Sequence, residues 1–597
     1  LWLLSTGAGT WALTGYWGPF TALSSTDQQA ALRTMSSAHL TPVRTLFTTF
    51  KGLTLVNAYG GSYEKTADGE LSHWAHKALG YAGGSRGAWP RITKSDSQWT
   101  PTFLDVSKTA QLHPEYGRVI DCDVVIVGSG AGGGVIAGLL AQAGHSVIVV
   151  EQGKYTHPAD LCLQELRSYA ELYHRSGGVT PRDCSIRILA GKAFGGGTYV
   201  NWSASLIPPH DVRKEWATRF NLPHFLSRDY QASLDAVTSR AGVGVSAVSH
   251  NVANQILIDA CKKLGYDWSV IPQNTAGQAH ECGYCTFGCP YGIKQGTHQS
   301  WLKDAANAGA RFIQQTTVNR VLHKHGRTIG VLATVQADGQ PLFVRARKVV
   351  ASAGALHTPA LLLRSGLTNP NIGRNLRLHP ATLVYGVFPS RLVESFKGSI
   401  MTVLSRVADN LDGSGYGAKL EISASHAGSL AVTLPWRSAA EHKRFMALES
   451  RLVPMLVLVR DYDSVGTVKL DPQGDSEISW ALSKRDARSI AAGLEASIDA
   501  LIIAGATEII TCQQTVPAFK VVDPSRADPF SCPAYKRYVA SVLAAAPVTS
   551  IFSAHQMGTA RMGASPSMGA CDPTGETWEV KGLYCGDGSL LPTASGV

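Results

Sequence analysis

The stretch Asp123–Glu151, DVVIVGSGAGGGVIAGLLAQAGHSVIVVE, decides the fold class of this chain. Its apolar, β-branched run 124–127 predicts a strand buried in a parallel sheet, and the run 147–150 predicts a second strand. The segment between them has one apolar face at helical spacing and ends at Gly144. We therefore expect a strand–helix–strand unit and an α/β (α+β mixed) fold.

The turn from strand to helix carries Gly128, Gly130 and Gly133 in the pattern G-x-G-x-x-G. Gly128 permits the tight turn, Gly130 lets the backbone approach a pyrophosphate, and Gly133 lets helix and strand pack closely. Glu151 closes the second strand, where a carboxylate can accept hydrogen bonds from a ribose. The unit predicts a site for an adenine dinucleotide.

Length and composition limit the remaining choices. A chain of 597 residues is too long for one core, and 44% hydrophobic with 16% charged residues is typical of a globular protein. The net charge of +10 is spread along the chain without a basic cluster, which argues against nucleic acid as a partner. Eleven irregularly spaced cysteines favour a reducing, intracellular compartment over a disulfide framework.

The order of motifs suggests four parts. We expect a helical N-terminal extension at 1–120, a dinucleotide domain at 121–380 with a Cys-rich helical insertion at 211–298, a substrate domain at 381–550, and a return to the first domain at 551–597. Besides the helix that Gly144 ends, helices are expected at 25–35, 42–57, 161–175, 301–307 and 486–504. Strands are expected at 312–321, 330–335, 342–350, 430–434, 455–459 and 467–470, and 330–335 with 342–350 resembles a hairpin.

Two further glycine-rich segments are candidates for cofactor contacts. Gly196, Gly197, Thr198 and Asn201 lie in GKAFGGGTYVN, which offers backbone N–H groups and an amide, although an ordinary turn fits the pattern equally well. Near the C-terminus, Asp587 and Gly588 follow a short expected strand. An Asp there can bind a ribityl hydroxyl, which favours a flavin over a nicotinamide, or it can simply form a turn.

His555 is the candidate catalytic base. It lies in SAHQMGTARMG, whose small residues leave space around an imidazole, and it precedes the Asp587 segment closely enough to share one cofactor with it. A neutral imidazole can take a proton from a hydroxyl group at physiological pH.

Several segments together resemble the glucose–methanol–choline (GMC) oxidoreductase family. They are GSGAGG with Glu151, GKAFGGGTYVN, SAGALHTPALLLRSG, NIGRNLRLHP, and HQMGTARMG followed by GDGSLLPTASGV, in the order of the family. The resemblance implies FAD, a Rossmann-like FAD-binding domain and a sheet-based substrate domain. It implies that His555 is the base, and it places Glu421 at an active-site Glu position. We also assign Val318 and Gly354 to the cofactor site.

The N-terminal extension, HECGYCTFGCPYGIKQGTHQSWL and LPWRSAAEHK are most similar to the long-chain fatty alcohol oxidases of this family. The resemblance implies oxidation of a long-chain primary alcohol by O2, giving an aldehyde and hydrogen peroxide. Dehydrogenation with another acceptor, a lyase or decarboxylase reaction on the same scaffold, and a non-catalytic or electron-transfer flavoprotein are the alternatives. Alcohol chain length, flavin attachment and oligomeric state stay open.

The family's second catalytic residue, an Asn or a His, follows the segment that matches 594–597. The sequence given stops at Val597, so either it is a fragment or the catalytic pair is incomplete.

Cys282, Cys285 and Cys289 form C-x2-C-x3-C, with His280 as the nearest fourth ligand for zinc or an iron–sulfur cluster. A loop without metal, either redox-inert or disulfide-bridged, is the interpretation we adopt.

No apolar run is long enough to span a bilayer. The apolar patches 1–13 and 46–55, the second beside Arg44 and Lys51, suit shallow contact with a lipid surface. We expect peripheral membrane association, with packing of this extension on the main body as the alternative.

Overall fold

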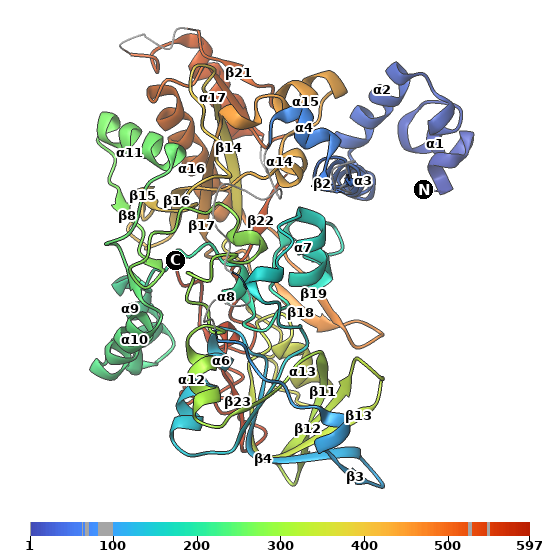
Figure 1. Ribbon diagram of the computed structural model, residues 1–597. Coiled ribbons are helices and arrows are strands. Elements are labelled where there is room, and N and C mark those ends of the chain that lie inside the picture. The colour runs from blue at the N-terminus through green and yellow to red at the C-terminus, as the bar shows by residue number, and fades with distance from the viewer. Residues whose placement is uncertain are drawn as a thin grey trace.

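The computed structural model describes residues 2–61, 64–65, 71–81, 93, 99–522, 528–545 and 550–596. Two large sheets lie at opposite ends of an elongated body, one at the bottom of Figure 1 and one at the top. The chain passes between these ends several times, and the C-terminal end lies near the middle of the view.

Five parallel strands form the centre of the lower sheet. They are β4 (Gly117–Val127), β5 (Val147–Val150), β10 (Arg311–Ile313), β13 (Pro341–Ala351) and β23 (Leu583–Cys585), in the spatial order β10-β5-β4-β13-β23. In chain order this is third, second, first, fourth, fifth, the arrangement of doubly wound dinucleotide-binding folds. The predicted strand–helix–strand unit is confirmed, although its first strand begins at Gly117, inside the segment assigned to the extension.

Antiparallel strands extend this sheet. They are β3 (Gln111–His113), β11 (Thr316–Lys324) and β12 (Arg327–Val335). The predicted hairpin is confirmed, because β12 pairs antiparallel with the first half of β13. The single strand expected at 312–321 is wrong: the chain breaks at Gln315, whose φ of 50° is outside the strand region, and enters β11.

Three helices pack on the lower sheet: α6 (Ala131–Gln142), α12 (Trp301–Asn307) and α13 (Thr358–Arg364). α6 and α12 approach closely at Gly138, where an added Cβ would lie 3.0 Å from the backbone oxygen of Trp301. Between α6 and α12 the chain forms α7 (Glu165–Leu172) and the short α8 (Gly197–Val200), among other elements.

The upper sheet is largely antiparallel, in the order β21-β20-β14-β17-β16-β15-β8, with β22 paired to β14 and β6 paired to β22. Its main strands are β14 (Ala381–Val387), β15 (Val403–Ala408), β16 (Gly417–Ile422), β17 (Leu452–Arg460) and β20 (Glu508–Thr511), and its short ones are β6 (Arg187–Ile188), β8 (Ser269–Val270), β21 (Phe519–Lys520) and β22 (Phe552–Ser553). Every residue of β17 is buried, so both faces of the sheet are covered.

Helices cover both faces of this sheet. One face packs against α11 (Val252–Leu264), α16 (Lys484–Ile503) and α17 (Pro533–Ala544), and the other against α14 (Ala427–Thr433) and α15 (Ala439–Met446). The predicted elements at 455–459, 467–470 and 486–504 are confirmed as β17, β18 (Thr467–Leu470, paired with β19, Ser476–Ser479) and α16.

The strand expected at 430–434 is wrong, because this segment forms most of α14. Leu430, Ala431 and Leu434 are buried at helical spacing against the core of the upper half. A five-residue segment with four apolar residues cannot distinguish a buried strand from a buried helix, and packing decides the outcome.

The insertion 211–298 is helical only in its first part. That part contains α9 (His210–Arg219), α10 (Arg228–Arg240) and α11, with the small β7 (Val243–Gly244) and β9 (Gln273–Asn274) pair. The cysteine-rich part that follows holds turns and one 3-10 turn at Cys285–Phe287.

The N-terminal region is helical, as predicted, with α1 (Gly7–Thr14), α2 (Ser25–Ser36), α3 (Thr41–Gly60), α4 (Trp74–Leu79) and α5 (Val106–Thr109), plus the pair β1 (Glu64–Lys65) and β2 (Leu71–Ser72). α3 packs against α14, and the Lys51 ammonium donates hydrogen bonds to the carbonyl oxygens of Val432 (2.8 Å) and Leu434 (2.5 Å). Figure 1 shows α1 and α2 standing away from the body beyond α3. None of the helices described has the length and apolar character needed to cross a bilayer.

Candidate active site

The first glycine loop presents backbone without side chains at the start of α6. Gly128 has φ of +99°, and a Cβ there would lie 2.3 Å from the carbonyl oxygen of Ser352. A Cβ on Gly133 would lie 2.1 Å from the carbonyl oxygen of Gly128. Around Gly130, by contrast, the only atom of a described, non-neighbouring residue within 4 Å of an added Cβ is Gly196 Cα, at 3.9 Å. The loop therefore packs tightly on its protein side and stays open at Gly130, the shape that a pyrophosphate needs.

The second glycine loop lies directly on the first. Gly196 has φ of +54°, and its added Cβ would meet Gly130 Cα at 2.7 Å. Ser129 joins the loops, because its hydroxyl accepts the Gly195 N–H at 2.9 Å. The Asn201 side-chain oxygen is buried and has no partner among the described residues, so it is available to a bound group. The Thr198 hydroxyl is already occupied, donating to the Gly195 carbonyl and accepting the Thr297 N–H.

Glu151 is buried at the end of β5. Its carboxylate accepts the Ser129 N–H (2.9 Å), the Ser129 hydroxyl (2.7 Å) and the Gly153 N–H (2.7 Å). Burial raises its pKa, and these hydrogen bonds oppose that shift. A carboxylate can accept about four hydrogen bonds, which leaves capacity for a ribose hydroxyl. Val318 lies nearby, in the apolar cluster that contains Val150.

Asp587 joins the end of the chain to β13. One carboxylate oxygen accepts the Gly354 N–H (2.8 Å) and the Thr358 hydroxyl (2.6 Å), and the other accepts the Ser589 N–H (2.8 Å). The neighbouring Gly588 accepts the Gly558 N–H at 3.0 Å. The predicted residues Gly354, Asp587 and Gly588 thus form one assembly, which also contacts the segment that carries His555.

His555 and the preceding Ala554 are exposed to solvent, whereas Ser553 and Met557 on either side of them are buried. Its N–H donates to the Ser553 hydroxyl at 3.1 Å, while its ring makes no hydrogen bond to any residue the structure describes. The surrounding protein lowers the pKa of this imidazole to about 4 by desolvation. A neutral, unpaired imidazole with space in front of it is suited to take a proton from a bound hydroxyl group.

Glu421 lies on β16, with Lys419 two residues before it on the same face. One of its carboxylate oxygens is buried without a partner among the described residues, and desolvation raises its pKa to about 7 against the opposing charge of Lys419. The Lys419 ammonium donates to the Gly596 carbonyl at 2.7 Å. The charge of Lys419 therefore acts on Glu421 while the Lys419 ammonium is bound to the backbone at Gly596. Among the described residues, Glu421 makes no hydrogen bond to His555.

Sequence reasoning missed several residues of this region: Ser129, Thr358, Lys419, His379 and Asp461. His379 is the most informative of them, because its ring lies 5.6 Å from that of His555. It belongs to NIGRNLRLHP, a segment used for the family resemblance but not for the site. Its contacts come from residues 82 and 217 positions away, so no local pattern reveals them.

The cysteine-rich segment carries free thiols. None of Cys282, Cys285 and Cys289 is in a disulfide, so the disulfide alternative for this segment is wrong. The thiol sulfur of Cys285 lies 3.3 Å from His280 Nε2. In the described part of the chain, no group of three or more His, Cys, Asp and Glu is arranged to hold a metal ion.

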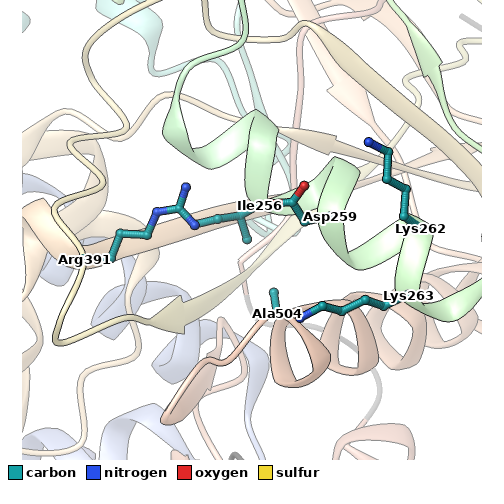
Figure 2. A pocket seen from close by; sticks show the side chains of 6 residues that line it. All are labelled: Ile256, Asp259, Lys262, Lys263, Arg391 and Ala504. Atoms are coloured by element: carbon teal, nitrogen blue, oxygen red, sulfur yellow. The ribbon is translucent and has the colours of Figure 1, made fainter.

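A surface pocket of about 390 Å³ lies elsewhere, between α11 and the end of α16 (Figure 2). Its lining consists of Ile256, Asp259, Lys262, Lys263, Arg391 and Ala504. Lys263 donates to the carbonyl oxygen of Ile503 at 3.2 Å, at the C-terminal end of α16, where a cation is favourable. None of the predicted site residues lines this pocket.

Comparisons with known proteins give the family of the chain. The GMC oxidoreductase family matches residues 169–381 with its N-terminal part and 463–597 with its C-terminal part. Two long-chain-alcohol oxidases of Arabidopsis thaliana are 35% and 34% identical, over 97% and 100% of this chain and 81% and 88% of their own lengths. A pyridoxine 4-oxidase from Mesorbium loti has a similar structure, with a TM-score of 0.58 and 16% identity over 80% of this chain and 96% of that one.

Proposed function

The chain belongs to the GMC oxidoreductase family and catalyses FAD-dependent alcohol oxidation, and on this premise we propose that its substrate is a long-chain primary alcohol and its electron acceptor O2. The balanced reaction converts one alcohol and one O2 into one aldehyde and one hydrogen peroxide. The observation that carries the proposal is the accessible, neutral His555 beside the assembly that links Asp587 to the glycine loops.

The residues present fit FAD. Bare backbone at Gly130 is open to a pyrophosphate, Glu151 has remaining acceptor capacity, and the buried oxygen of Asn201 is unpaired. When bound, FAD supplies the hydride acceptor and passes two electrons to the oxidant. Glu151 would hold the ribose and Asn201 a polar edge of the flavin.

His555 takes the proton from the alcohol hydroxyl. Its ring makes no hydrogen bond to the residues that the structure describes, and its pKa of about 4 keeps the imidazole neutral at the pH of the cell. Removal of the hydroxyl proton makes the carbinol carbon a better hydride donor. Glu421, with its pKa near 7 and an unpaired oxygen, is proposed as a second polar group at the substrate side.

The test is a product balance with pure, FAD-loaded protein. Hexadecanol should give aldehyde and peroxide in equal amounts, at a higher kcat/KM than butanol. Aldehyde without peroxide, accompanied by reduction of an added dye, would instead indicate a dehydrogenase. Release of carbon dioxide from a fatty acid under blue light, without alcohol oxidation, would indicate a decarboxylase.

We also propose that the N-terminal helices touch a lipid surface, the phase in which such a substrate dissolves. Trp2, Trp11 and Trp17 are 75%, 58% and 72% exposed on and around α1, and Leu40 is 69% exposed. Tryptophan rings favour the interface between lipid and water. Lys51 does not contribute as expected, because it points inward to α14, so the proposed surface is centred on α1.

Co-sedimentation with vesicles tests this surface. A variant with Trp2, Trp11 and Trp17 replaced by serine should stay in the supernatant while the unmodified protein sediments. The matched control replaces Trp74, which is 66% exposed on α4. Equal sedimentation of all three proteins would rule out the surface around α1.

A further inference from the structure

His379 occupies a strained turn next to the candidate base. Its φ of +47° is unusual for a residue with a side chain. The turn is held by Asp461, whose carboxylate accepts the backbone N–H groups of Leu378 (3.0 Å) and His379 (3.1 Å). Asp461 is fully buried, so it keeps the turn in one conformation. Backbone strain that is fixed in this way is often found at functional sites.

The same turn is fastened to the segment that carries His555. Arg377 and Met557 exchange backbone hydrogen bonds of 2.9 and 3.0 Å. The Ser553 hydroxyl donates to the carbonyl of Leu378 and accepts the N–H of His555. The two histidines therefore belong to one hydrogen-bonded unit, with their rings tilted by 56°.

The His379 ring has one defined partner. Gly596 N–H donates to Nε2 at 3.0 Å, so Nε2 carries a lone pair and the proton of the neutral ring is on Nδ1. Nδ1 lies 3.8 Å from a carboxylate oxygen of Asp461, beyond hydrogen-bond distance, and no described residue bonds to it.

The charges around His379 keep its ring neutral. Burial, followed by the charges of His555, Lys419, Arg460 and Arg377, lowers its pKa well below the ordinary value. Lys419 and Arg460 are themselves fixed on the same stretch of backbone, where they donate to the carbonyls of Gly596 (2.7 Å) and Ala594 (3.0 Å). When His555 gains a proton during oxidation, His379 therefore remains an acceptor.

We propose that His379 is a positioning residue for alcohol oxidation, holding His555 on one side and the 593–596 backbone on the other. It does not touch the proton that is transferred. The hydrogen bond from Gly596 N–H to Nε2 fixes the His379 ring. The fixed ring then limits the orientations of the neighbouring His555 imidazole. This inference rests on the proposed role of His555.

Two substitutions distinguish the role of the His379 hydrogen-bond acceptor from that of the volume of its side chain. In H379Q the amide oxygen can reach the place of Nε2 and accept the Gly596 N–H, whereas H379L has no acceptor. H379L should bind FAD normally but reduce it with alcohol about 10- to 100-fold more slowly, the cost of a base displaced by about 1 Å. H379Q should regain most of the rate and keep the acid limb of the pH profile where the unmodified protein has it.

Three outcomes would overturn the proposal: an unchanged rate in H379L, a rate in H379Q no better than in H379L, or a rate in H379Q as low as in H555A. The last would make His379 itself the base. If H379L does not fold, H379N replaces it, because its side chain is too short to reach Gly596.

A crystal structure adds a readout that needs no substrate. The His555 ring and residues 593–596 should shift in H379L and keep their native positions in H379Q. If no alcohol reduces the native flavin, the proposed function fails, but this structural comparison still decides the role of His379. Native positions of His555 in H379L would refute it.

Discussion

The two glycine loops and the surroundings of His555 are built in opposite ways. The loops are formed by backbone that lacks side chains, with Gly196 against Gly130 and Gly133 against Gly128. The region of His555 depends on side chains from distant parts of the chain, such as Asp461 and Lys419. The loops form a surface that a cofactor can fit, whereas the region of His555 orients the side chains that would take part in the reaction. Substitutions in the two regions should therefore fail differently, the first in cofactor content and the second in rate.

The largest effect is expected for Gly130→Val. The variant should fold, because an added Cβ meets only Gly196 Cα at 3.9 Å, yet it should lose all FAD because the side chain fills the place of the pyrophosphate. Absorbance of the purified protein measures this loss. Gly132→Ala is the control for the packed side of the loop, since its Cβ would lie 1.7 Å from the Gly586 carbonyl oxygen and should prevent folding. FAD retained by Gly130→Val would refute the assignment of the loop.

His555→Ala should show the opposite behaviour, with full FAD content and slow chemistry. Loss of a positioned base lowers the rate of flavin reduction by roughly 10²- to 10⁴-fold. Stopped-flow absorbance measures it, with the exposed His39 replaced by alanine as the control. A native rate in His555→Ala would leave the region of the histidines without a catalytic role.

Asp587 connects the two regions, so the variant Asp587→Asn should have an intermediate effect. Asparagine keeps one acceptor oxygen, so it cannot serve Gly354, Thr358 and Ser589 together. An unmet buried hydrogen bond costs about 1–3 kcal/mol, so FAD should bind about 10- to 100-fold more weakly. Titration of apoprotein with FAD measures this, and Asp572→Asn is the control, because Asp572 also accepts backbone N–H groups in a turn. Equal affinities of the two variants would contradict the role of Asp587.

The smallest effect on the rate of flavin reduction is expected when the pH is lowered moderately. The base acts in its neutral form, and its pKa is about 4, so about nine-tenths of it is still active at about pH 5. The rate of flavin reduction should fall only as the pH approaches 4. A half-maximal rate near the ordinary histidine value of 6.5 would contradict the desolvation of the His555 imidazole by the surrounding protein. Between these two pH values the unfolded chain binds a proton that the folded chain does not, so this group makes the free energy of unfolding rise with pH.

The same contrast explains what the sequence could predict. The strand–turn–helix unit, its glycines and the hairpin are local patterns, and each corresponds to an element in the structure. The sequence predicts a strand at 430–434 because so short a segment, with four apolar residues, shows no clear period, and the partner of α14, α3, lies more than 360 residues earlier. His379 was missed for a related reason, since its partners are fixed by tertiary packing and not by spacing along the chain.

The lower sheet also has a consequence for how the protein is made. Its fifth strand, β23, and Asp587 are translated more than 230 residues after β13, beside which β23 lies. A ribosome therefore completes the whole upper half before the cofactor cradle can close, and the nascent chain carries an unfinished sheet edge during that time. Unpaired edges of this kind promote aggregation, and contacts so distant in sequence form slowly. Supply of FAD at the end of synthesis, rather than during it, should govern the yield of active protein in cells.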